Sequence, residues 1–217
     1  MLEQLLYSGK LGDGCLTKQS KTSNATITFN TICIDYLIHK KCILEQNNIT
    51  TSHITYGLSG YKKGGKIPRF SSRVDERITR VYDMTRLECI KSLDKQGLIY
   101  LFLDDGSLHK TKLFGNIYCN SFNDEEVKAL IDKIFELYPG VRCSKLIDRK
   151  KDGREYPYVS IKKATMFDFL KDIQDFVIKY DIQDMFYKAN IPSTTISKES
   201  TPKWVEISIT LKSKDIV

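Results

Sequence analysis

The hydrophobic pattern of the first half of the chain alternates between helical and strand-like spacing. Apolar residues recur at helical spacing from Leu2 and stop at the glycine-rich turn 12–14, which predicts a short helix. The β-branched segment 26–34 alternates as a strand does, and a helical pattern follows it to about Leu44. Segments 53–61 and 68–74 predict two strands around the basic turn 62–66, and a short helix is expected from Glu76 to about Met84.

The same order of elements then begins again. The apolar segment 96–106 predicts a helix that ends at Asp105-Gly106, and its apolar residues on every side require burial. Segments 108–114 and 116–122 predict paired strands with a turn at Gly115-Asn116. Asn123 can cap a helix that ends at Pro139-Gly140. Strands near 141–147 and 156–162 flank the charged turn 148–153, a helix is expected over 165–180, and a late strand over 204–211.

The two halves therefore share one order of helix, two strands, helix, two strands and helix. If the two Asp-Gly turns correspond, the period is 105 − 13 = 92 residues, which is too long for a solenoid repeat. The pattern predicts an α+β fold of two pseudo-symmetric αββαββα half-domains. We expect an N-terminal half over 1–92, a C-terminal half over 93–190, and a C-terminal extension over 191–217.

Composition narrows the class of partner and the compartment. The formal net charge of +7 favours binding to polyanions, of which nucleic acid is the leading candidate. The six cysteines form no CxxC pair and have no zinc-like spacing with histidine, so we expect reduced thiols. No signal peptide and no membrane span are expected, which predicts an intracellular protein in a reducing compartment, in the cytoplasm of a bacterial or phage-infected cell or in an organelle.

The aspartates of the two Asp-Gly turns, Asp13 and Asp105, are the most informative residues. If the first helices of the two halves pack side by side, their C-terminal ends bring these two carboxylates together. The negative end of a helix disfavours a carboxylate pair unless a cation lies between the two groups. Carboxylates are the usual ligands of Mg²⁺ in phosphodiester chemistry. The alternative for each aspartate alone is an ordinary turn residue, because Asp-Gly is a common turn dipeptide.

Four segments resemble the LAGLIDADG homing endonucleases in their single-chain, two-motif form. LIYLFLDDGSL (98–108) resembles the apolar variant of the signature, and SGKLGDGCL (8–16) resembles its LGDG variant, although Ser8 and Lys10 depart from the usual residues. NSFNDEEVKAL (120–130) resembles the segment after the second motif, and MFYKANIP (185–192) resembles a late segment with a basic active-site residue. The resemblance covers most of the chain and implies packing through the two motif helices, with curved antiparallel sheets that form a DNA-binding saddle.

The resemblance also implies the active-site residues. Asp13 and Asp105 would hold Mg²⁺ or Mn²⁺, with the backbone carbonyls of Gly12 and Asp104 as further ligands. Lys188 would stabilise charge on the phosphate or orient the attacking water. Its counterpart in the first half is Arg86 by pseudo-symmetry, with Lys66 as the alternative.

By the same resemblance, the paired strands would lie in the major groove of double-stranded DNA. Because the strands of the two halves differ, the site should be long and asymmetric, and the protein should act as a monomer. The basic residues expected to contact bases or phosphates are Lys18, Lys21, Lys62, Lys63, Lys66, Arg69, Arg73, Lys110, Lys112, Lys145, Arg149 and Lys162. The expected function is site-specific double-strand cleavage that promotes mobility of an intron or intein. The alternatives are an RNA-binding maturase that assists splicing of its host intron and a non-catalytic DNA-binding protein on the same fold.

Overall fold

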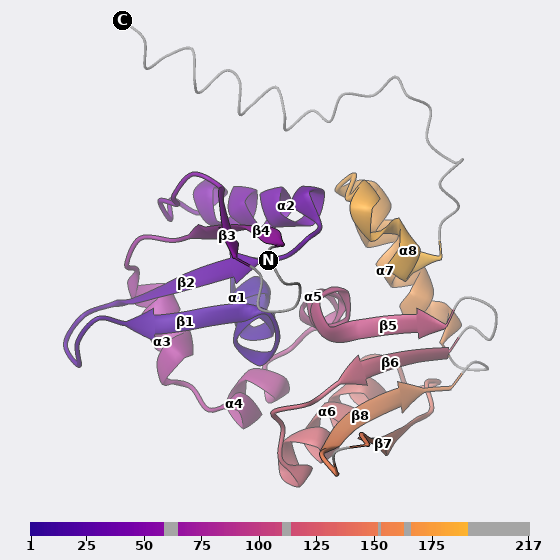
Figure 1. Cartoon of the computed structure of the whole chain (residues 1–217). Helices are drawn as coiled ribbons and strands as arrows, with labels where there is room; N and C mark the ends of the chain where they lie inside the picture. Colours follow the sequence, from indigo (N-terminus) through magenta and orange to yellow (C-terminus); the bar gives the residue numbers. More distant parts are fainter. Residues whose placement is uncertain (59–64, 110–113, 152, 163–165, 191–217) are drawn as a thin grey trace, which may run out of the picture.

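Two halves with the same order of elements make up the part of the chain that is described here, which in this computed structural model is residues 1–58, 65–109, 114–151, 153–162 and 166–190 (Figure 1). The first half contains α1 (Leu2–Leu11), β1 (Gly14–Lys18), β2 (Ala25–Asn30), α2 (Ile34–Gln46), β3 (Thr55–Leu58), β4 (Lys66–Ser71), α3 (Glu76–Asp83) and α4 (Arg86–Lys91). The second half contains α5 (Lys95–Asp105), β5 (Gly106–His109), β6 (Phe114–Tyr118), α6 (Asp124–Leu137), β7 (Cys143–Arg149), β8 (Glu155–Ile161), α7 (Phe167–Lys179), the 3-10 turn η2 (Gln183–Met185) and α8 (Phe186–Ala189). The expected αββαββα order is confirmed, with a few short helices added at the ends.

Each half contains one antiparallel four-stranded sheet, with the strand order β1-β2-β4-β3 in the first and β5-β6-β8-β7 in the second. Side chains alternate between the two faces of each sheet. One face, here called the helix face, carries buried residues such as Ile27, Phe29, Ile117 and Val159 that pack in the core. The opposite face, here called the outer face, carries polar and partly exposed residues. Among the described residues, the side chains of the outer faces can therefore contact a ligand.

The helices α1 and α5 lie side by side between the two sheets (Figure 1). At their N-terminal ends, Gln4 donates to the carbonyl of Ser92 at 3.1 Å and accepts from the backbone N–H of Asp94 at 2.9 Å. At their C-terminal ends, Gly12 meets the side chain of Asp105. Since the same ends meet, the two helices run in the same direction and deliver both Asp-Gly turns to one place. Residues 97–103 of α5 are all buried, as their apolar character requires.

Three details of the strands differ from the expectation. The strand over 26–34 ends at Asn30, because Cys33 is already the N-cap of α2. The strand β1 after the first turn was not singled out by its pattern. Gly115-Asn116 is not a turn but lies inside β6, where a Cβ on Gly115 would come within 2.5 Å of Met166. Glycine is needed there for close packing, and residues 110–113, which connect β5 to β6, lie outside the described residues.

Contacts beyond the pairing of α1 with α5 hold the first half together and join it to the second half. Lys10 of α1 donates to the carbonyls of Val81, Tyr82 and Met84, which holds the C-terminal end of α3 against the motif helix. Asp184 of the second half accepts a hydrogen bond from the backbone N–H of Asp35, in the first turn of α2, at 2.7 Å. The late strand expected over 204–211 lies outside the described residues. None of the described helices has the length and apolar character needed to cross a membrane.

Candidate active site at the helix seam

The C-terminal ends of α1 and α5 bring the two predicted aspartates into one cluster. Asp105 is the last residue of α5. The helix α1 ends at Leu11, and Asp13 follows after Gly12. The two helices approach so closely that a Cβ on Gly12 would lie 2.6 Å from Oδ2 of Asp105. Position 12 therefore has to be glycine for the Asp105 carboxylate to occupy its place. We call this group of Gly12, Asp13, Asp104 and Asp105 the seam cluster.

The carboxylates of the seam cluster repel one another. Burial, followed by the charges of Asp13 and Asp104, raises the pKa of Asp105 to about 7. Burial of the carboxylate and the charge of Asp104 also raise the pKa of Asp13, although Asp13 as a whole residue is exposed. Lys188 and Lys40 oppose both shifts, but they do not cancel them. A bound cation would relieve this repulsion.

Lys40 of α2 is a basic residue of the site that the sequence did not single out. Its Nζ lies 2.5 Å from Oδ1 of Asp104, and the two side chains are 1% and 0% exposed. The same ammonium lies over the rings of Phe29 and Tyr36, at 4.7 and 4.3 Å from their centroids. Lys40 follows Tyr36 by four residues and so lies on the apolar side of α2, which is the signal in the sequence that could have identified it.

Lys188 of α8, the basic residue that the resemblance singles out, lies at the same end of α5. Its Nζ donates to the carbonyl of Leu103 at 2.6 Å and to the carbonyl of Asp104 at 3.1 Å. These are carbonyls of the last helical turn, which have no intrahelical partner and favour a cation. Burial lowers the pKa of Lys188 below its ordinary value. The seam carboxylates act in the opposite direction but do not cancel the effect of burial. The C-terminal end of α5 is thus held by one lysine from each half.

The donor set of the seam cluster fits a hard divalent cation. Among the described residues, no three His, Cys, Asp or Glu side chains converge on a common metal position. Two carboxylates, from Asp13 and Asp105, and the nearby backbone carbonyls of Gly12 and Asp104 would supply oxygen ligands. Mg²⁺ is usually bound by one or two carboxylates and completes its shell with water and substrate phosphates. Oδ2 of Asp104 is buried without a hydrogen-bond partner, although Oδ1 of the same carboxylate pairs with Lys40.

The structure places the two candidates for a second basic residue away from this cluster. Arg86 at the start of α4 donates to the carbonyl of Ser121 at 2.8 Å and lies 6.0 Å from the ring of Phe122. It therefore joins α4 to the segment before α6. Lys66 is exposed at the start of β4. Lys40 is the lysine of the first half that lies in the seam cluster.

The predicted DNA-contacting residues fall on both faces of the sheets. Lys18 forms an ion pair with Asp83 of α3, and Lys145 forms one with Asp124 of α6, so both point to the helix face rather than the outer face. Arg69 is exposed on the outer face of the first sheet, where its register neighbours are Asn30 and Thr55. Exposed positions at strand ends and connections are held by Lys21, Arg73, Arg149 and Lys162, whereas Lys62, Lys63, Lys110 and Lys112 lie outside the described residues.

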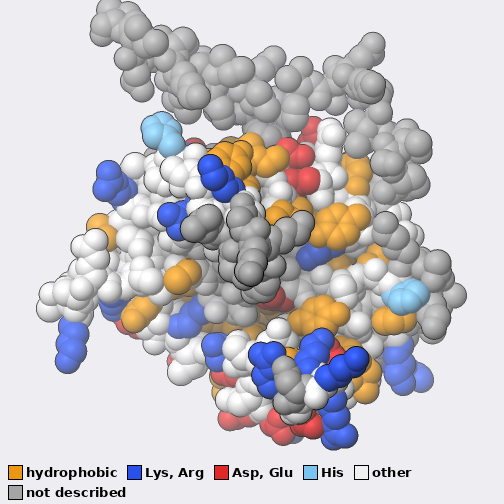
Figure 2. All heavy atoms as spheres, viewed as in Figure 1, with side chains coloured by type: hydrophobic (Ala, Val, Ile, Leu, Met, Phe, Trp, Pro, Cys, Tyr) orange, Lys and Arg blue, Asp and Glu red, His pale blue; other side chains and the backbone are white. Residues whose placement is uncertain are grey.

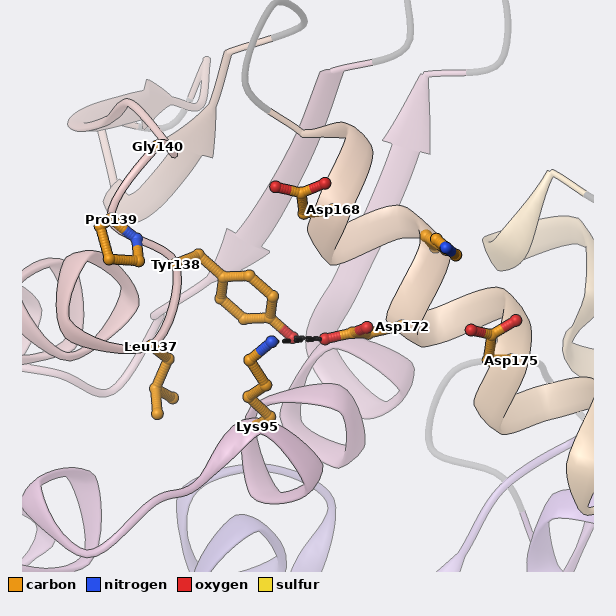
Figure 3. Close-up of a pocket in the computed structure, with 9 residues that line it drawn as sticks. Lys95, Leu137, Tyr138, Pro139, Gly140, Asp168, Asp172 and Asp175 are labelled. Atoms are coloured by element: carbon orange, nitrogen blue, oxygen red, sulfur yellow. Dashed lines mark hydrogen bonds and ion pairs between the residues drawn. The ribbon is translucent and has the colours of Figure 1, made fainter.

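A separate pocket of about 370 Å³ lies at the other end of α5 (Figure 3). Lys95 begins α5 and Asp105 ends it, so the pocket is about 15 Å along the helix from the seam cluster. Asp172 of α7 accepts from Tyr138 at 2.8 Å and pairs with Lys95 at 3.1 Å, while Asp168 and Asp175 line the same pocket. Three aspartates and two lysines, Lys95 and Lys171, line the pocket, so its charge does not favour phosphate groups.

Comparisons with known proteins agree with this arrangement. The model of the LAGLIDADG DNA endonuclease family matches residues 9–169. The homing endonuclease I-WcaI bound to its DNA recognition sequence is 20% identical, with a TM-score of 0.67 over 88% of this chain and 86% of that chain. I-DmoI in complex with DNA and Mn is 16% identical, with a TM-score of 0.55 over 79% and 95% of the two chains.

A further solved structure with the same fold is full-length DUF199/WhiA from Thermatoga maritima. It is 12% identical, with a TM-score of 0.52 over 99% of this chain and 67% of that chain. No curated protein sequence matches the chain. At these identities the solved structures establish the fold alone.

Proposed function

The chain belongs to the LAGLIDADG DNA endonuclease family, and we propose that it is a homing endonuclease that uses a divalent metal to cut both strands of a long asymmetric DNA site. The observation that carries this proposal is the seam cluster, in which Asp13 and Asp105 from the two halves lie at one point. Two related structures contain DNA together with Mn or Ca, which supports a divalent metal at such a site. Cleavage of an insertion site would promote mobility of the intron or intein that encodes the protein.

The roles of the residues follow from their positions. Asp13 and Asp105 would hold Mg²⁺ or Mn²⁺, with one carboxylate directed to each strand. When bound, the metal supplies a Lewis acid that polarises a phosphate and lowers the pKa of a ligated water. Lys188 lies beside the last turn of α5, where its ammonium would stabilise negative charge on the reacting phosphate or orient the attacking water. Lys40 cannot reach a phosphate at the surface, because it is buried against Asp104.

The DNA would lie across the outer faces of the two sheets. A β-sheet fits the major groove, in which each base pair presents a distinct pattern of donors and acceptors. The net charge of +7 supports attraction to the phosphate backbone. The two outer faces carry different side chains, so one chain would read two different half-sites without a partner subunit.

The decisive experiment is cleavage with a matched pair of variants. A random duplex library is incubated with purified protein and Mg²⁺ or Mn²⁺, and the cleaved molecules are sequenced. The recovered site is then placed in a plasmid and offered to the wild type, to Asp13→Asn and to Asp105→Asn. We expect the wild type to linearise the plasmid and each variant to lose double-strand cleavage while it still binds the site.

Two results would contradict the proposal. Tight binding of a selected site without cleavage in either metal would identify a DNA-binding protein without nuclease activity. An undiminished rate in either aspartate variant would remove that residue from the metal site. The variant Asp83→Asn serves as a control, because Asp83 pairs with Lys18 at the helix face, away from the seam cluster.

A further inference from the structure

The outer face of the second sheet contains an uninterrupted apolar row that crosses three strands. In the register of the sheet, Tyr118 of β6 lies opposite Tyr158 of β8, which lies opposite Leu146 of β7. The two tyrosine rings are 6.0 Å apart between centroids. Tyr118 is 39% exposed and Leu146 is 44% exposed. These three residues, here called the Tyr-Leu row, lie on the face opposite to Ile117 and Val159, the buried neighbours of the two tyrosines.

The first sheet has no such row on the outer face of its described residues. There Thr17 lies within hydrogen-bond distance of Thr26 at 3.1 Å, and Thr28 lies 2.8 Å from Ser71. Arg69 is the exposed cation of this hydroxyl-rich surface. The first sheet is therefore suited to hydrogen bonds with base edges. The second sheet has a different chemistry at the corresponding place.

The Tyr-Leu row is continuous with the seam cluster. Asp105 is followed directly by β5, whose first residue, Gly106, pairs with Ile117 of β6. Tyr118 is the next residue of β6, so the row lies level with Asp105 along the strands. Neighbouring strands are about 4.8 Å apart, so the row extends sideways from the active site by about three strand spacings. An extended ligand that lies across the outer face from Asp105 toward β7 would also contact these side chains.

The charge around the row fits a polyanion. The β7–β8 connection beside it carries Lys150, Lys151 and Arg154, of which Lys150 pairs with Asp148 at 2.6 Å. Figure 2 shows Lys and Arg side chains gathered in this part of the surface, with hydrophobic side chains next to them. An apolar row bordered by cations matches the major groove, where apolar methyl groups lie between two phosphate backbones. The only apolar group that a base pair presents there is the C5-methyl of thymine.

We propose that the Tyr-Leu row determines specificity in the second half-site by contacting thymine methyl groups in the major groove. The inference rests on the proposed function, because it needs DNA across the outer faces. It adds the chemical basis of recognition on one side of the site. The first sheet would read its half-site through hydroxyl groups and Arg69, with no comparable dependence on methyl groups.

Uracil substitution in the DNA tests the inference directly. Uracil pairs with adenine as thymine does but lacks the methyl group. In the site recovered from the library, thymines are replaced by uracil in one half-site at a time, and the Kd for wild-type protein is measured in Ca²⁺. Burial of one methyl corresponds to about a fourfold change in affinity. We expect about fourfold weaker binding for each contacted methyl in one half-site, and an unchanged Kd when uracil replaces thymine in the other.

Two neighbouring residues of β7 provide matched variants. Leu146 and Ile147 are 44% and 43% exposed, but they lie on opposite faces of the same strand. We expect Leu146→Ser to weaken binding to thymine DNA and to abolish the difference between thymine and uracil DNA. Ile147→Ser should retain both the affinity and the uracil effect. A purely structural role of Leu146 would leave the uracil effect in place.

The outcomes separate this inference from the proposed function. If the protein cuts its selected site but uracil changes the Kd in neither half-site, the inference is overturned and the nuclease assignment stands. A selected site without thymine in the half that responds to Leu146→Ser also overturns it. If no DNA is bound or cut, the proposed function fails and the inference fails with it. A uracil effect that survives in Leu146→Ser and disappears in Ile147→Ser would assign recognition to the helix face, and this result also overturns the inference.

Discussion

Replacement of Lys40 by methionine should destabilise the protein strongly, because it leaves a buried carboxylate without its cation. Lys40 and Asp104 are 1% and 0% exposed, with Nζ and Oδ1 2.5 Å apart. The other oxygen of Asp104 already lacks a hydrogen-bond partner. Removal of one member of a buried ion pair typically costs about 3–5 kcal/mol. For a domain of this size each kcal/mol lowers Tm by roughly 2–4 °C, so we expect a fall of about 6–20 °C.

The assay is urea and thermal unfolding of the metal-free protein, with two controls. Lys41→Met removes the next lysine of α2, which pairs with Glu45 near the surface, and should change the free energy of unfolding by less than about 1 kcal/mol. The double variant Lys40→Met/Asp104→Leu replaces the whole pair by apolar groups and should recover most of the lost stability.

Two results would refute this reasoning. Unfolding of Lys40→Met at the same urea concentration as Lys41→Met would mean that Asp104 does not need its cation. A double variant as unstable as the single one would locate the loss in the packing of the lysine stem against Phe29 and Tyr36 rather than in the buried charge.

Two further predictions concern the seam cluster and the packing of β6. Because burial and Asp13 raise the pKa of Asp105 to about 7, the folded metal-free protein retains a proton that the unfolded chain releases near pH 4. The contribution of Asp105 to the free energy of unfolding should therefore fall as the pH rises from about 4 to 7, and a slope that Asp105→Asn leaves unchanged in urea titrations would contradict this. Gly115→Ala places a Cβ 2.5 Å from Met166 and should cost about 1–3 kcal/mol, whereas Gly140→Ala, with no atom within 4 Å, should be neutral by thermal unfolding.

Local patterns were sufficient to predict the duplicated fold. The apolar surface of α5 required a buried helix, and residues 97–103 are buried on every side. The prediction that Asn123 caps a helix is confirmed, since its side chain accepts from the backbone N–H of Glu126. The two residues are only three positions apart, so a local pattern could identify the cap. The prediction of a turn at Gly115 was wrong, because the contact that explains this glycine is not local. A glycine needed for close packing and a glycine needed for a turn look the same in sequence, and the neighbour that distinguishes them, Met166, is 51 residues away (166 − 115).

Only part of the candidate site could be predicted from the sequence, because contacts between residues far apart in the chain leave no local pattern. Asp13 and Asp105 each end a helix of their own repeat, so symmetry could pair them. Lys40 and Asp104 have no such relation, since their contact joins α2 of one half to α5 of the other. Pseudo-symmetry favoured Arg86 as the partner of Lys188, but the structure gives Arg86 a contact with Ser121. A charge that acts across an interface cannot be assigned from a repeat pattern alone.

The seam cluster depends on groups that each half lends to the other. Asp184 of the second half accepts from the first turn of α2, the helix whose next turn carries Lys40. Lys40 in turn reaches Asp104 of α5, and Lys188, four residues after Asp184, holds the carbonyls at the end of the same helix. The position of Asp105 is therefore set by contacts that close a loop through both halves. Because the contacts Asp184–Asp35 and Lys40–Asp104 both join one half to the other, the metal-binding geometry should arise only when the two halves dock.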